Sequence, residues 1–253
     1  MAVNINGDTG IDKVQPGTID SADFGPGVIT APAIATSAVT APKVAGADGS
    51  AGQYLQSDGD GTMSWITAAA GGFSNMEVFT SPGTWTNPGT VEKVKVTVVG
   101  GGGTGGAYRG GGGGAGGAAI EVIPFPSGTN VPLTVGGAGG TSSFGAYCSA
   151  TGGSNGSNPS TAGLGGSGSG GDINIDGSDG TAGSPSPSGN GGSGGHGGAS
   201  IFGAQGRGGR LTAGGAGGNY GGGGGGGGTP TPGLPNTTPP GGAGGAGVVI
   251  VEY

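Results

Sequence analysis

The residues with the clearest capacity for chemistry are three oxygen-bearing side chains at alternate positions, Asp172, Asn174 and Asp176, with a glycine directly after them. Calcium loops of the EF-hand kind place oxygen ligands at the first, third and fifth positions and glycine at the sixth. The bidentate acid that such loops carry at the twelfth position is missing here, because a glycine stands there. Alternation along an extended strand explains the same residues without a metal, since it turns Ile173 and Ile175 inward and the polar side chains to solvent. Calcium binding therefore stays an alternative to a segment with no metal.

The sequence supports a catalytic site even less than it supports a calcium site. His196 is the only histidine, and its Gly-Gly-His-Gly-Gly surroundings lack the nucleophile and the acidic partner of a triad. Paired carboxylates for glycan cleavage would have to come from Glu121 and the acids around Asp172. Residues 101–106 match a dinucleotide-binding fingerprint, but the glycine run at 110–117 cannot form the helix that this motif requires. We predict no enzymatic activity and no cofactor.

Composition excludes several further classes of protein. Glycine contributes 74 of 253 residues and proline 17, while seven basic and 14 acidic residues carry all the charge. Collagen needs glycine at every third position and far more proline, and glycine inside helices costs about 1 kcal/mol per residue. The net charge of -7 leaves no basic surface for nucleic acid or anionic membranes. No apolar run is long enough for membrane insertion, and no secretory signal is present, which predicts assembly in a cytoplasm.

The elements that must position any site begin with a repetitive segment, residues 1–47. Apolar side chains recur here at every fifth position without interruption, at Val14, Ile19, Phe24, Ile29, Ile34, Val39 and Val44. A period of five fits neither a helix nor a flat strand, and it indicates an extended path that turns every few residues. One apolar residue in five cannot bury a core within one chain, whereas three chains around one axis could. We predict a homotrimeric shaft, with a flexible Ala/Thr/Pro linker as the alternative.

Two further parts follow. Residues 48–72 predict a β-hairpin connector, because short apolar runs flank a double Asp-Gly turn. Residues 73–253 combine strand patterns with glycine blocks, and the strands are expected at 91–99, 118–125, 131–135 and 248–253. The fold class that we predict is mainly β and extended, with almost no α-helix.

The glycine blocks predict order rather than a floppy linker. In several of them a non-glycine residue recurs at every third position, a three-residue beat, as in residues 191–199, 214–219 and 241–247. Polyproline II helices have three residues per turn and no internal hydrogen bonds. Neighbouring helices of this kind can satisfy each other's buried backbone groups if no side chain separates them, which requires glycine at the contacts. We therefore expect a β-sandwich-like domain with packed polyglycine II helices, in which an inter-helix hydrogen-bond lattice replaces a hydrophobic core.

Both ends of this third part resemble a known family. Residues 79–103, Phe-Thr-Ser-Pro-Gly-Thr-Trp-Thr followed by an alternating valine strand and four glycines, and residues 244–253, Gly-Gly-Ala-Gly-Val-Val-Ile-Val-Glu-Tyr, look like the glycine-rich domain of bacteriophage tail fibres. Residues 48–65 and the five-residue repeats also resemble phage fibre connectors and shafts. The glycine blocks are similar to those of T-even-type tail-tip adhesins, in which polyglycine II helices present variable loops to the host surface. This chain departs from those separate tip proteins by carrying its own shaft-like N-terminus.

The resemblance implies a structural tail fibre that docks to other tail proteins through its N-terminal part and binds a bacterial surface glycan or outer-membrane protein through its glycine-rich part. Its localisation would be the tail of the virion, after assembly in the host cytoplasm. Recognition would fall on segments between the glycine blocks, where aromatic, arginine and rigid proline residues are favoured anchors. The candidates are Tyr108, Arg109, Tyr147, Arg207, Arg210, Tyr220, Pro232 and Pro235. For Phe144, Ile201 and Phe202, packing against the bundle or sheet is the alternative to binding.

Two other functions stay open. The chain could be a purely structural virion fibre or connector without receptor contact. It could also be an antifreeze or cell-wall protein built on polyglycine II, which would present a regular flat face of repeated small or Thr residues. The irregular segments between the blocks disfavour that second alternative.

Overall fold

The structure, a computed structural model, describes residues 49–59, 62–67, 72–89, 91–124, 129–185, 191–230 and 238–253, and the chain divides into two compact units, 1–71 and 72–253. The described residues form antiparallel strands and extended segments and no helix, which confirms the mainly β expectation. The seven apolar residues of the five-residue repeat lie outside the described residues, so the shaft stays a prediction.

The described part of the first unit is a β-hairpin. Strand β1 (Gln53–Ser57) pairs antiparallel with β2 (Met63–Thr67), with Ser57 opposite Met63 beside the turn. The Asp58 carboxylate accepts hydrogen bonds from the hydroxyls of Thr62, at 3.2 Å, and Ser64, at 2.6 Å. These bonds tie Asp58, at the end of β1, to β2.

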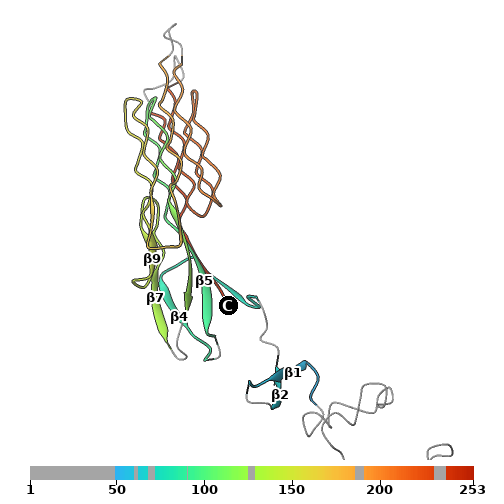
Figure 1. Ribbon diagram of the computed structural model, residues 1–253. Helices are drawn as coiled ribbons and strands as arrows, with labels where there is room; N and C mark the ends of the chain where they lie inside the picture. The colour runs from blue at the N-terminus through green and yellow to red at the C-terminus, as the bar shows by residue number, and fades with distance from the viewer. Residues whose placement is uncertain are drawn as a thin grey trace, which may run out of the picture. The chain divides into compact units, whose positions relative to one another are not determined.

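Two five-stranded antiparallel sheets form the base of the second unit (Figure 1). We call the first the β5 sheet; its order is β11-β6-β5-β12-β3, with β11 Ile173–Ile175, β6 Ala118–Pro124, β5 Lys93–Val99, β12 Val248–Glu252 and β3 Met76–Phe79. We call the second the β7 sheet; its order is β10-β9-β8-β7-β4, with β10 Gly168–Ser169, β9 Cys148–Ala150, β8 Ser142–Phe144, β7 Asn130–Thr134 and β4 Gly83–Thr86.

A hydrophobic core lies between the two sheets. Alternation along β5 turns Val94, Val96 and Val98 toward it, and the β7 sheet contributes Trp85 and Phe144, all fully buried. The rings of Trp85 and Phe144 lie 6.1 Å apart in a tilted arrangement, within the range of favourable aromatic pairs. Side chains thus hold this part of the unit together.

The glycine segments extend beyond the ends of the strands as a bundle of side-by-side strands of chain (Figure 1). Residues 100–106 leave β5 and return antiparallel as 110–117 to begin β6. Their hydrogen bonds recur every third residue along both segments, from N–H to C=O at Gly100–Gly117, Gly103–Gly114 and Gly106–Gly111, at 2.8 to 3.0 Å. The two intervening residues of each triplet are left to bond other neighbours.

Residues 221–228 show how completely a segment can be surrounded. All eight are glycine and all are buried. Three consecutive N–H groups donate to three different segments, from Gly222 to Gly218, Gly223 to Gly198 and Gly224 to Gly103. Three consecutive carbonyls accept from three more, from Gly116 to Gly221, Gly245 to Gly222 and Gly206 to Gly223. Six neighbours, three by each kind of group, enclose this run, and residues 110–117 are enclosed in the same manner. We call the whole assembly the glycine lattice.

Backbone contact explains the three-residue beat of the sequence. A Cβ added to Gly223 or Gly224 would overlap the carbonyl oxygen of Gly113 or Gly242 respectively, so only hydrogen fits there. In residues 191–199, by contrast, every third position carries a side chain, and Ser193, His196 and Ala199 face outward while the glycines between them face neighbours.

Hydroxyl groups complete the hydrogen bonding at the rim of the lattice. The N–H groups of Leu164, Ser167 and His196 point outward, and the side-chain oxygens of Ser154, Thr151 and Thr181 accept them at 2.7 to 2.8 Å. At the rim, the outward-facing serine and threonine side chains of one segment therefore accept the hydrogen bonds that the backbone of another segment accepts in the interior.

Candidate functional site

The register of the lattice decides which turns lie together. Because Gly100 and Gly117 adjoin the strands, the pair Gly106–Gly111 and the turn 107–109 lie at the far end. The turns 158–160 and 210–212 lie at the same end: Ser160 donates to the Arg109 carbonyl at 3.0 Å, Arg109 to Gly228 at 3.4 Å, and Gly228 to Thr212 at 3.0 Å. We call these three turns the distal turns. They bring Tyr108, Arg109 and Arg210 of the predicted residues into one region.

Tyr108 and Arg109 form a constrained turn. Both have left-handed backbone conformations, with φ of 45° and 56°, which non-glycine residues adopt at a cost. The guanidinium carbon of Arg109 lies 4.8 Å from the centroid of the Tyr108 ring, in cation–π contact. The buried Nε of Arg109 has no hydrogen-bond partner among the described residues. A fixed main chain thus presents an aromatic ring and a cation together.

Arg207 and Arg210 occupy the same outward column of residues 203–210. They are three residues apart, which corresponds to about 9 Å at an extended-helix rise of ~3.1 Å per residue. Both side chains are exposed, and neither forms an ion pair within the part of the chain that the structure describes. His196 lies beside this column, with its Nδ1 accepting a hydrogen bond from the Gly208 N–H at 3.4 Å. Cationic side chains therefore continue from the distal turns along one flank of the lattice.

Tyr220 lies at the opposite end, where residues 219–221 turn back near the sheets. It has a left-handed φ of 67°, and its carbonyl accepts a hydrogen bond from the Ser200 hydroxyl at 2.5 Å. The ring packs against a small cluster of Val99, Ala118 and Val248 on the outer side of the β5 sheet. The structure therefore separates Tyr220 from the distal turns, and the neighbouring turn with Ile201 and Phe202 remains exposed.

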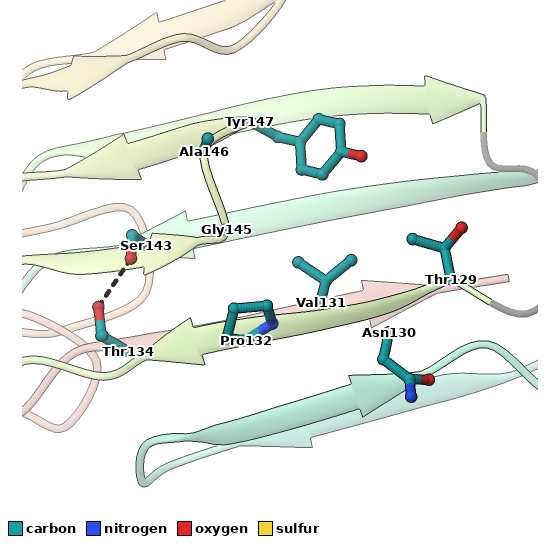
Figure 2. Close-up of a pocket in the computed structure, with 9 residues that line it drawn as sticks. All are labelled: Thr129, Asn130, Val131, Pro132, Thr134, Ser143, Gly145, Ala146 and Tyr147. Atoms are coloured by element: carbon teal, nitrogen blue, oxygen red, sulfur yellow. Dashed lines mark hydrogen bonds between the residues drawn. The ribbon is translucent and has the colours of Figure 1, made fainter.

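Tyr147 belongs to neither end of the lattice, because it lies in the turn between β8 and β9. A cavity of about 360 Å³ opens beside it (Figure 2), lined by Thr129, Asn130, Val131, Pro132, Thr134, Ser143, Gly145, Ala146 and Tyr147. Gly145, at φ 53°, donates to the Pro132 carbonyl at 2.8 Å, and the Tyr147 ring packs 6.2 Å from buried Phe144. The ring is thus held in place over a cavity without acidic or basic side chains, large enough for a small ligand.

Sequence reasoning singled out Tyr147 but not this cavity. Its walls come from β7, β8 and the following turn, and only the pairing of β7 with β8 brings them together. Pro232 and Pro235 lie outside the described residues.

The oxygen-bearing segment at the edge of the β5 sheet is tied to backbone. Asp172 accepts a hydrogen bond from the Val122 N–H at 2.9 Å, and Asn174 bonds Gly171 in both directions, at 2.8 and 3.1 Å. Over the described ranges, no group of three or more His, Cys, Asp or Glu side chains could hold a metal ion. The inward orientation predicted for Ile173 is wrong: its side chain is 54% exposed, because pairing with β6 places it opposite Ile120 on the outer face.

Another titratable pair, Glu121 and Cys148, lies near the core. Burial raises the pKa of the Glu121 carboxyl, although a hydrogen bond with Cys148 acts in the opposite direction. Burial, together with the nearby Glu121, raises the pKa of the Cys148 thiol to about 12. A thiol in this state is a poor nucleophile at neutral pH, because the reactive form is the thiolate.

None of the described segments forms a helix long and apolar enough to cross a membrane. The chain matches no protein-family model, and it matches no curated protein.

Proposed function

We propose that the chain is a structural bacteriophage tail fibre that attaches to the virion by its N-terminal part and recognises the host surface by its glycine-rich domain. The observation that carries this proposal is the gathering of Tyr108, Arg109 and Arg210 at the far end of the glycine lattice. Tyr108 and Arg109 are half-buried and Arg210 is exposed, and aromatic and arginine side chains on a constrained main chain are typical of binding surfaces. The target would be a bacterial surface glycan or an outer-membrane protein, and the step would be adhesion without chemistry.

The lattice would serve as a rigid support for these turns. Its hydrogen bonds recur every three residues, and each segment bonds its neighbours rather than itself, which supports packed polyglycine II helices. Recognition groups fixed before binding lose less conformational entropy when they bind. The unfavourable left-handed conformations of Tyr108 and Arg109 are consistent with such a role.

The homotrimer predicted from the five-residue repeat would strengthen adhesion further. Three identical domains on one fibre, and several fibres on one particle, raise the effective concentration of each binding site after the first contact. Weak individual contacts at the distal turns would then suffice for attachment.

The alternatives explain fewer of these features. A fibre without receptor contact gives no reason for the aromatic and cationic pair at the far end. An ice-binding face would need a regular array of small or threonine side chains, whereas the outward columns of the lattice contain Leu164, His196 and Arg207.

Phage adsorption provides the test. Tyr108→Gly removes the aromatic ring, and glycine tolerates the left-handed backbone conformation of this turn. Arg210→Ala removes a cation from a neighbouring turn. We expect the double variant to lower the apparent affinity of the particles for host cells by roughly tenfold or more, the effect of about 1.4 kcal/mol of lost binding energy. Tyr54→Ala, in the exposed face of the hairpin, is the matched control. Particles with normal fibre content and unchanged adsorption would overturn the adhesin proposal and favour the purely structural fibre.

A further inference from the structure

The outer face of the β5 sheet, on the side away from the core, carries exposed apolar side chains near both of its edges. Strand register aligns one residue from each of its five strands in a single row, Val78, Ile250, Thr97, Ile120 and Ile173. The next row contains Met76 and Val122 at its ends. We call these seven residues the outer apolar face.

Several of these side chains are exposed in the single chain. The exposed fractions are 64% for Met76, 46% for Val78, 47% for Val122 and 54% for Ile173. Tyr220 packs against the adjoining cluster of Val99, Ala118 and Val248, toward the lattice, and so does Ile250; Thr97, at the centre of the first row, is buried. Exposed apolar side chains gathered on one face of a sheet mark an interaction site more often than single scattered residues do. Their presence on both edge strands, β3 and β11, makes them a hazard unless another surface covers them.

Two charges of opposite sign lie within the second row. Lys95 and Glu252 lie between Met76 and Val122 in the second row, and their side chains form an ion pair at 2.7 Å. No further ion pair occurs among the residues that the structure describes. The two rows therefore offer apolar side chains and an internally satisfied pair, with the exposed Lys93 beside them on β5, which suits a largely apolar partner surface.

We propose that the outer apolar face packs against the outer apolar faces of the other copies of this chain within the fibre. This proposal rests on the homotrimer of the proposed function. The size of the face favours this partner over a separate protein. Five strands spaced about 4.8 Å apart and two rows of side chains give an area on the order of 300 Å², whereas a stable independent complex buries roughly 800 Å² per partner.

Tethering compensates for that small area. Only residues 72–75 separate the first unit from β3, and four residues span at most about 14 Å. Chains held together through their N-terminal parts would therefore keep their domains at effective concentrations on the order of millimolar. A surface too small to bind a free partner would pair under those conditions. Contact through this face would leave the distal turns and the cavity beside Tyr147 free.

Cysteine crosslinking of the full chain tests the contact. Val78→Cys and Ile173→Cys each place a thiol on the outer apolar face, and Thr84→Cys places one on the exposed outer face of the β7 sheet as the control. The native Cys148 stays silent, because it is buried and its pKa is raised to about 12. Each variant is treated with a short bismaleimide at neutral pH. We expect roughly tenfold more crosslinked chain from the two apolar-face variants than from Thr84→Cys, as domains tethered at millimolar effective concentration would give.

A mass measurement of the untreated chain separates the two proposals. A trimer whose apolar-face variants crosslink no more than Thr84→Cys would overturn this contact and leave the proposed fibre intact. A stable monomer would overturn the homotrimer and this contact with it. A trimer that crosslinks strongly at Val78 and Ile173 would support both.

Discussion

The paired sheets and the glycine lattice are joined in one unit, but the interior of the sheets is built from side chains and the interior of the lattice from backbone. Between the sheets, Trp85 and Phe144 pack with valine side chains, and the distance between backbones follows from side-chain size. In the lattice the backbones touch: the Gly224 N–H donates to the Gly103 carbonyl at 2.9 Å, and its own carbonyl accepts from Gly113 at 2.8 Å. A side-chain core can adjust to a changed volume, whereas a backbone lattice leaves no atom that can move aside.

The free-energy balance of the two regions differs in the same way. Fixing a residue costs roughly 1–2 kcal/mol, near the upper end for glycine, while one hydrogen bond contributes a net ~0.5–1.5 kcal/mol. A lattice of glycine is therefore favourable only when both the N–H and the C=O of each residue are bonded. The sheets help by fixing where its segments begin, since 100–106 follows β5, 110–117 precedes β6 and 241–247 precedes β12.

The largest expected effect is a methyl group in the enclosed run. In Gly224→Ala the new Cβ would overlap the Gly242 carbonyl, so at least two segments must separate and several hydrogen bonds must break. We expect a loss of more than about 4 kcal/mol in the free energy of unfolding, the range of exceptional single substitutions. Thermal unfolding followed by circular dichroism, together with amide hydrogen exchange of residues 221–228, would measure it.

Gly137→Ala is the matched control for this prediction. Gly137 also lies in a glycine block, but its added Cβ would meet nothing within 4 Å and its φ is not in the left-handed region. The same chemical change should be neutral or stabilising by about 0.4–1 kcal/mol, because alanine restricts the unfolded chain. Equal effects at the two positions would contradict a lattice held by backbone contact.

The three-residue beat and the strand patterns made much of this contrast predictable from sequence. The identity of each segment's neighbours was not predictable, because glycine blocks are chemically alike and nothing in 221–228 distinguishes one partner from another. For the same reason the sequence could not show that Tyr108 and Tyr220 lie at opposite ends. The error at Ile173 has a related cause: alternation indicates two faces of a strand, and only the pairing with β6 decides which of them meets the core.

The second effect in size concerns the side-chain core. Phe144 is fully buried and contacts the rings of Trp85 and Tyr147, so Phe144→Ala removes a large apolar surface and leaves a cavity. We expect a loss of about 3–5 kcal/mol, and Phe144→Leu should lose less because most of the volume is kept. Chemical denaturation of both variants would test this graded response. A core that behaved like the lattice would respond to both substitutions equally.

The smallest expected effect lies at the rim, where side chains replace backbone partners. Ser154 accepts a hydrogen bond from the Leu164 N–H at 2.7 Å and donates to the Leu164 carbonyl at 3.3 Å. Ser154→Ala removes both bonds, but Leu164 is exposed, so water can replace the lost oxygen and the cost should be about 1 kcal/mol or less. Ser178→Ala is the control, because the Ser178 hydroxyl has no hydrogen bond among the described residues while its N–H donates to Ala199.

Hydrogen exchange separates local from global effects at this rim. The Leu164 amide should exchange faster in Ser154→Ala, while the amides of residues 221–228 should keep their protection, since each rim bond joins only two adjacent segments at the surface. A loss of protection throughout the lattice would show that the hydroxyls hold the assembly as firmly as the enclosed glycines do. Side-chain hydrogen bonds at the surface would then contribute to the stability of the interior of the bundle as well as to its rim.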